Sequence, residues 1–169
     1  SQSRWINLNS LPSLTGYDRY EDVYFINPST GWVIHFSGKI YKTVNGGITF
    51  TQQSNNSGAV FRCTGFFDEN TGIIGTLNDT ASLLRTTNSG LNWSRISNIN
   101  GAYPLGICGI HIVNSNTAIG VGRYSCPPYF LKTTDKGVSW VSYSMEPAQI
   151  KSLVDCYFWS ADSGIVVGG

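Results

Sequence analysis

The side chains of this 169-residue chain that could support acid–base catalysis are thinly spread. His35 and His111 fall inside apolar, β-like runs with no serine or cysteine motif beside them. Each is therefore interpreted as a strand histidine rather than a general base. Asp18 and Asp79 could form the kind of carboxylate pair that glycosidases use, but no motif links them. The pattern predicts no catalytic residue.

Arginines suggest a second chemistry, because sialidases hold their substrate with an arginine triad. Such a site also needs a tyrosine paired with a glutamate, and no motif ties the candidates together. A phosphate-binding loop is absent as well, since "GVGR" at 120–123 is too short and lacks the Lys-Ser/Thr ending. We therefore expect a protein that is not an enzyme, with a glycosidase as the alternative. The residues considered for a sialidase site are Arg19, Arg62, Arg123, Glu21, Glu69 and Glu146.

The four cysteines have neither the C-x-x-C spacing nor the neighbouring histidines of a metal site. They are Cys63, Cys108, Cys126 and Cys156. We expect no metal and no cofactor. Two alternatives remain for the thiols. They form up to two disulfides, as in an extracytoplasmic protein that is secreted, periplasmic or on the cell surface, or they are buried free thiols. An extracytoplasmic location is the prediction.

Composition limits the fold and the partners. Eleven basic residues balance ten acidic ones, so no overall field favours nucleic acid. No apolar run approaches the roughly 18 residues of a membrane-spanning helix. The start "SQSRWINL" has no signal-peptide pattern and could be the mature end left after one was removed. Nineteen glycines with frequent Ser, Thr and Asn indicate an all-β chain of short strands and turns.

The elements that position these side chains recur along the chain. An octapeptide appears as "TVNGGITF" (43–50), "TTNSGLNW" (86–93) and "TTDKGVSW" (133–140). A second landmark keeps the same period, as "STGW" (29–32), "NTGI" (70–73), "NTAI" (116–119) and "DSGI" (162–165). Six residues before its Gly or Ala stands an apolar residue: Phe25, Phe66, Ile112 or Phe158. Two landmarks with one period indicate an internal repeat.

Each unit contains short β-like runs joined by tight turns, which is typical of an antiparallel meander. A repeated four-stranded meander of about 45 residues predicts the blade of a β-propeller. We expect blades at about 18–56, 57–101 and 102–148, then a half-blade at 149–169. Residues 1–17, with "RWINL" (4–8), are the candidate for a ring-closing strand.

The octapeptide is predicted to be a structural turn between the third and fourth strands. Its third residue can bond to turn amides, its glycine can take a positive φ, and its last aromatic can pack over the turn. The structural positions are Thr43, Asn45, Gly47 and Phe50, then Thr86, Asn88, Gly90 and Trp93, and finally Thr133, Asp135, Gly137 and Trp140.

These octapeptides resemble the Asp-box, S/T-x-D/N-x-G-x-T/S-W/F, of bacterial-neuraminidase-type repeats. With "TGW" and "IYKTVNGG", the wider unit resembles the propeller repeat of the photosystem II stability and assembly factor over about residues 18–169. Phe50, the Asn of the first two copies and Ala118 depart mildly from the pattern. The resemblance implies a seven-bladed ring, of which about three and a half blades are present.

Strand direction places the octapeptides on one face of the propeller. The loops that lead into each blade, and those between second and third strands, lie on the opposite face, where propellers usually bind. We expect a cationic, aromatic-lined rim there for a protein or peptide partner. A glycan is the alternative partner, as in a secreted sialidase-like or xyloglucanase-like propeller, and an adhesion module is a third alternative. The candidate binding residues are Arg19, Lys39, Arg62, Tyr103, Arg123, Tyr124, Tyr129 and Lys151.

Overall fold

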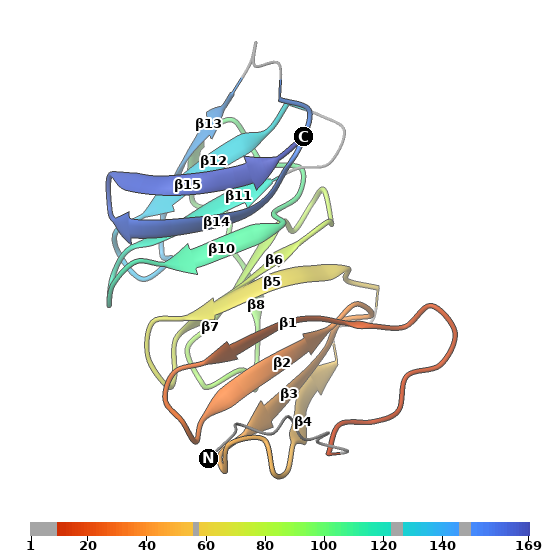
Figure 1. Ribbon diagram of the computed structural model, residues 1–169. Coiled ribbons are helices and arrows are strands. Elements are labelled where there is room, and N and C mark those ends of the chain that lie inside the picture. Colours follow the sequence, from red (N-terminus) through yellow and green to blue (C-terminus); the bar gives the residue numbers. More distant parts are fainter. Residues whose placement is uncertain (1–9, 56–57, 123–126, 146–149) are drawn as a thin grey trace, which may run out of the picture.

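A computed structural model describes residues 10–55, 58–122, 127–145 and 150–169. Its described residues form four successive sheets of mainly antiparallel strands, stacked so that one edge strand of each sheet lies beside an edge strand of the next (Figure 1). This arrangement confirms the all-β propeller fold. No described helix is long and apolar enough to cross a membrane.

The strands follow the predicted meander. The first blade holds β1 (Tyr20–Phe25), β2 (Gly31–His35), β3 (Lys39–Thr43) and β4 (Thr51–Asn55), and the second holds β5 (Phe61–Phe66), β6 (Gly72–Thr76), β7 (Leu83–Thr86) and β8 (Ser94–Arg95). The third holds β9 (Ile99–Gly101), β10 (Gly109–Ile112), β11 (Ala118–Gly122), β12 (Tyr129–Thr133) and β13 (Trp140–Ser144), and the fourth holds β14 (Leu153–Ser160) and β15 (Ser163–Gly168).

The third blade differs from the expected boundary at residue 102. β9 precedes that boundary, yet it pairs in parallel with β13 and covers the outer edge of the third sheet. Gly101 permits this with a φ of 98°. This pairing has no sequence signal, because a three-residue strand is too short to show an alternating pattern. Residues 10–17 contain no strand, and "RWINL" lies outside the described residues.

Three apolar clusters join neighbouring blades. Trp32 on β2 stacks on Phe66 of β5, with ring centroids 3.6 Å apart and planes 8° from parallel. Ile73 lies in the second cluster with Trp140 and Ile107. Ile119 lies in the third with Leu153 and Phe158 of β14. Each cluster therefore combines the second strand of one blade with strands of the next.

The glycine of the second landmark makes room for the aromatic residue opposite it. A Cβ at Gly31, Gly72 or Gly164 would lie within 2.4 to 2.7 Å of the ring of Phe25, Phe66 or Phe158, respectively. In the third blade the pair is Ala118 opposite the smaller Ile112. The repeated Phe-to-Gly spacing is thus a cross-strand pair in which the large side chain covers the small one.

The octapeptide turns, residues 43–50, 86–93 and 133–140, share one hydrogen-bond pattern. The glycine amide donates to the first threonine hydroxyl over 2.9 to 3.0 Å, and the seventh-position amide donates to the side chain of Asn45, Asn88 or Asp135 over 2.9 to 3.0 Å. The fourth position also has a positive φ, even where it is Ser89 (63°) or Lys136 (57°). Its amide bonds to the carbonyl of Ser29, Asn70 or Asn116, which ties each turn to the loop before the second strand.

The last aromatic of the octapeptide takes a different environment in each blade. Trp93 donates from Nε1 to the carbonyl of Gly90 over 3.0 Å and so packs over its own turn. Trp140 is 1% exposed and belongs to the cluster between the second and third blades. Phe50 is half-buried. The third turn therefore contributes most to packing between blades.

An ion pair between Asp68 and Lys136 joins the second blade to the third octapeptide turn, with Oδ2 and Nζ 2.9 Å apart. Burial alone would raise the pKa of Asp68, but Lys136 and the amides of Asn70 and Thr71 lower it from 3.8 to about 2. A lowered folded-state pKa stabilises the fold above about pH 4, and this contribution is lost as the pH falls toward 2.

Asp68→Asn should therefore flatten the pH dependence of unfolding between pH 4 and 2. Urea unfolding at several pH values measures this, and Lys136→Met should reduce the same dependence. An unchanged slope in both variants would show that the pair contributes nothing to acid sensitivity.

Candidate functional site

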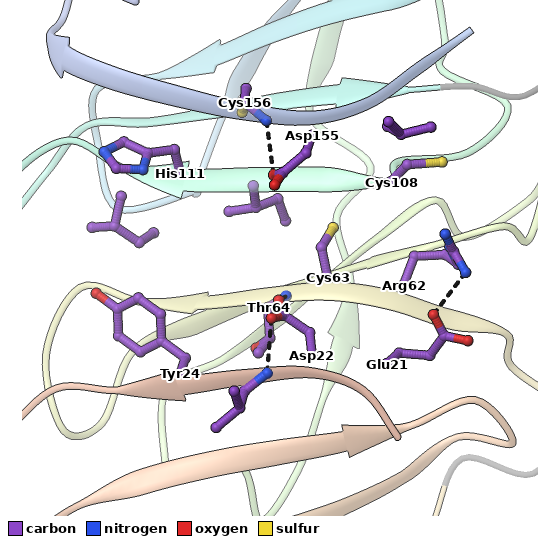
Figure 2. Close-up of a pocket in the computed structure, with 14 residues that line it drawn as sticks. Glu21, Asp22, Tyr24, Arg62, Cys63, Thr64, Cys108, His111, Asp155 and Cys156 are labelled. Carbon is purple, nitrogen blue, oxygen red and sulfur yellow. Dashed lines mark hydrogen bonds and ion pairs between the residues drawn. The ribbon is translucent and has the colours of Figure 1, made fainter. Parts of the chain in front are cut away.

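A cavity of about 470 Å³ lies between β1, β5, β10 and β14, one strand from each blade (Figure 2). A smaller hollow of about 240 Å³ adjoins it and is lined by Arg62, Leu77, Cys108 and Val154. Three of these four residues line the larger cavity as well. The shared residues lie where strands enter the blades, so this end opens toward the face opposite the octapeptide turns.

Irregular strand pairing positions the side chains at this end. The register of β1, β5 and β14 with their neighbours shifts once near the start, which leaves Glu21, Arg62 and Val154 as extra residues. A bulge of this kind re-aims a side chain and increases local twist. All three extra residues line the cavity.

Glu21 forms ion pairs with two arginines at the cavity mouth. Its side chain is 5% exposed and pairs with Arg19 and with Arg62, whose Nη1 lies 2.6 Å from Oε2. Arg19 also lies over the ring of Phe36, 4.1 Å from its centroid. The two arginines predicted to form a cationic rim thus share one buried carboxylate. Glu21 therefore partly neutralises both arginines, of which Arg19 stays half exposed.

Asp22 and Asp155 are the remaining carboxylates of the cavity and occupy equivalent positions in the first and fourth blades. Asp22 accepts hydrogen bonds from the amides of Val23 and Thr64, each over 2.8 Å. Burial nevertheless raises its pKa above 3.8, and Asp155 and Glu21 add to the rise. Asp155 is exposed and accepts from the amide of Cys156 over 2.8 Å.

The two histidines have different environments. His111 lines the cavity, its ring centroid is 4.5 Å from that of Tyr157, and burial lowers its pKa. His35 is 2% exposed, and its Nδ1 lies 2.8 Å from Ser37 Oγ. His35 is thus a strand histidine in contact with its own loop, whereas His111 faces the cavity.

Cys63 and Cys156 line the same cavity as buried free thiols, so the two-disulfide alternative is wrong. Burial raises the pKa of Cys63 well above 9.0 and that of Cys156 to about 12. Both thiols stay protonated near neutral pH and are poor nucleophiles. Cys126 lies outside the described residues, and the extracytoplasmic location stays a prediction. Within the described ranges no group of His, Cys, Asp or Glu could hold a metal ion.

The other predicted contact residues do not gather at the cavity. Tyr129 was wrongly assigned to the surface: it is 7% exposed and packs in the cluster between the second and third blades. It begins β12, where alternate side chains point into the core. Among the rest, Lys39 begins β3, Tyr103 contacts Arg95, Lys151 is exposed, and Arg123 and Tyr124 lie outside the described residues.

Sequence reasoning identified Arg62 but missed Glu21, Asp22, His111 and Asp155 as a group. Asp18 and Asp79, considered as the carboxylate pair, do not line the cavity. A signal was present in the repeat alignment, since Asp22 and Asp155 each stand three residues before the landmark phenylalanine.

Successive sheets stacked around a shared cavity define a β-propeller, and comparison with solved structures agrees. The chain matches "YCF48 bound to D1 peptide" with a TM-score of 0.59 and 23% identity over 73% of this chain. It matches YCF48 from Cyanidioschyzon merolae with a TM-score of 0.62 and 19% identity over 86% of this chain. An ancestral GH74 enzyme matches with a TM-score of 0.64 and 16% identity over 82%.

These identities show a shared fold. The chain spans 38%, 49% and 20% of the lengths of the two YCF48 structures and the GH74 enzyme, respectively. No protein-family model matches it, and no curated protein matches it.

Proposed function

We propose that this chain forms part of a propeller that binds a protein or peptide partner at the cavity mouth, on the face opposite the octapeptide turns. The observation that carries the proposal is the cavity itself, in which four blades present charged and polar side chains. The fold likeness to YCF48 bound to a D1 peptide supports it. A larger, seven-bladed ring is part of the same proposal.

The charge of the cavity selects the kind of peptide. Glu21 is paired with arginines, whereas Asp22 and Asp155 add negative charge without a cationic partner among the described ion pairs. Asp155 is the more exposed of the two. A peptide with an arginine or lysine side chain would place a donor beside the exposed carboxylate of Asp155. This replaces the cationic rim expected from the sequence.

Four labelled pentapeptides test the proposal: Gly-Gly-X-Gly-Gly amides in which X is Arg, Lys, Glu or Leu. Fluorescence anisotropy should show binding of the arginine and lysine peptides in preference to the other two. Asp155→Asn should weaken arginine-peptide binding roughly ten- to a hundredfold, since a hydrogen bond to a charged group contributes about 1.5–3 kcal/mol.

Asp162→Asn is the matched control, because Asp162 lies in the β14–β15 turn at the opposite end and pairs with Lys132. Its affinity should equal that of the unmodified chain. Equal binding of all four peptides, or equal loss in the two variants, would contradict the proposed site.

A glycan-active propeller is the second candidate, favoured by Asp22 and Asp155 in one cavity. The raised pKa of Asp22 is the property that a general acid needs, and Asp155 is a second carboxylate that lines the same cavity. The fold likeness to a GH74 enzyme supports this alternative.

Hydrolysis assays separate the candidates. The chain is incubated with a fluorogenic sialoside and with a β-glucan, and released fluorophore or reducing sugar is measured. The binding proposal predicts no release. Hydrolysis that disappears in both Asp22→Asn and Asp155→Asn would establish the enzyme instead.

A further inference from the structure

The dipeptide Asn-Gly occurs twice in the chain, as Asn45-Gly46 in the first octapeptide turn and as Asn100-Gly101 in β9. Such a dipeptide can react with itself, because glycine has no Cβ to keep its backbone nitrogen away from the preceding asparagine side chain. The two copies have different surroundings in the structure, and these surroundings decide which copy reacts.

Hydrogen bonds hold both polar atoms of the Asn45 side chain. Its Oδ1 accepts from the Thr43 hydroxyl over 3.0 Å and from the Thr49 amide over 2.9 Å, and its Nδ2 donates to Thr49 Oγ1 over 2.9 Å. The nitrogen that would attack is also occupied, since the Gly46 amide donates to the Ser29 carbonyl over 2.8 Å. A reaction at Asn45 therefore requires the turn to open.

Asn100 lacks these restraints. Its side chain is exposed and forms no hydrogen bond with a described residue. The Trp140 amide donates to the Asn98 carbonyl over 2.9 Å, and in a parallel ladder only alternate residues of a strand bond to their partner. Asn98 and Asn100 therefore bond to β13, and the amide of Gly101 faces away from the sheet.

The attack also requires β9 to leave its extended conformation locally. β9 has three residues and pairs only with β13, at the outer edge of the third sheet. Short segments at an edge open at a low free energy, whereas the octapeptide turn adds the bonds of its side chains to the cost of opening. The two sites should therefore differ in rate while the chain is folded.

We propose that Asn100 is a site of spontaneous conversion to aspartate and isoaspartate in the folded chain, and that the octapeptide turn protects Asn45. The Gly101 nitrogen attacks Asn100 Cγ and forms a cyclic imide. The bond from Cγ to Nδ2 breaks, and ammonia leaves with the proton of the Gly101 amide. Solvent water then opens the imide at either carbonyl, which gives aspartate or isoaspartate.

Isoaspartate at position 100 should loosen the pairing of β9 with β13. It places the side-chain methylene in the backbone, so β9 becomes longer and shifts against Val141, the partner of Asn100. The bond from the Trp140 amide to Asn98 should weaken, and hydrogen exchange at that amide should become about fivefold faster. Asn100→Asp adds the charge without the longer backbone and should exchange at the unmodified rate.

Peptide mapping by mass spectrometry tests the proposal on the whole chain during storage in mildly alkaline buffer. In the folded chain, conversion at Asn100 should be at least roughly tenfold faster than at Asn45, where more hydrogen bonds must break. In guanidinium chloride, which unfolds the chain, the two sites should convert at similar rates. Asn98 is the matched control, because the branched side chain of Ile99 shields the nitrogen that follows it.

Equal conversion of Asn45 and Asn100 in the folded chain, or conversion of Asn100 only after unfolding, would overturn the proposal. Exchange at the Trp140 amide is then compared between fresh and stored chain. Equal exchange in the two would overturn the loosening of β9, and so would faster exchange in stored Asn100→Gln, which lacks the reactive site.

Discussion

Trp140→Ala is expected to lower the free energy of unfolding by about 3–5 kcal/mol, the range for a buried tryptophan replaced by alanine. Trp140 ends the third octapeptide, is 1% exposed and packs with Ile73, Leu83 and Ile107. Its removal leaves a cavity between the second and third blades that rigid β-strands cannot fill. Such a loss is a large share of the roughly 5–15 kcal/mol that stabilises a typical domain.

Tyr143→Ala provides the control, because Tyr143 lies on the same strand and is 57% exposed. Its effect should stay within about 0.5 kcal/mol. Urea denaturation followed by fluorescence and circular dichroism measures both variants. Similar losses in the two would mean that Trp140 does not hold the joint between blades.

Thr133→Val should cost about 1–3 kcal/mol, because it leaves a buried amide without its acceptor. The Thr133 hydroxyl accepts from the Gly137 amide over 3.0 Å and donates to Asp135 over 2.8 Å, and the residue is 2% exposed. Valine keeps the shape and removes these bonds together with a longer one from the Asp135 amide. The equivalent bonds of Thr43 and Thr86 predict similar losses in those turns.

Thr133→Ser keeps the hydroxyl and should recover most of the stability. Unfolding of the two variants by urea gives the comparison. A valine variant as stable as the unmodified chain would show that the hydrogen bonds of the Thr133 hydroxyl contribute nothing to stability.

The blades were predictable from the sequence because each complete blade contains the same turn. That turn requires a glycine, an acceptor side chain and an aromatic residue at fixed positions, so it recurs as a similar octapeptide. The positive φ of Ser89 and Lys136 was not predictable, since most residues avoid that conformation and tertiary bonds to Asn70 and Asn116 impose it. β9 was missed because its pairing depends on a distant strand.

The site was less predictable than the fold. Loop position alone predicted which face carries the charged residues. In the structure, Glu21 and Arg62 lie at strand bulges and form an ion pair with each other. Bulges have no clear signal in a single sequence. Tyr129 was misplaced because the start of β12 was taken as part of a loop, whereas its side chain points into the core. Asp22 and Asp155 share a repeat position, and their alignment offered the one available signal.

The binding proposal is tested most directly by mapping where a peptide contacts the chain. Amide shifts of the isotopically labelled protein are recorded by nuclear magnetic resonance while the arginine pentapeptide is added. The largest shift changes should fall on residues around the cavity, namely the amides of Asp22, Thr64, His111 and Asp155. Changes centred on the octapeptide turns, or none at any peptide concentration, would contradict the binding proposal.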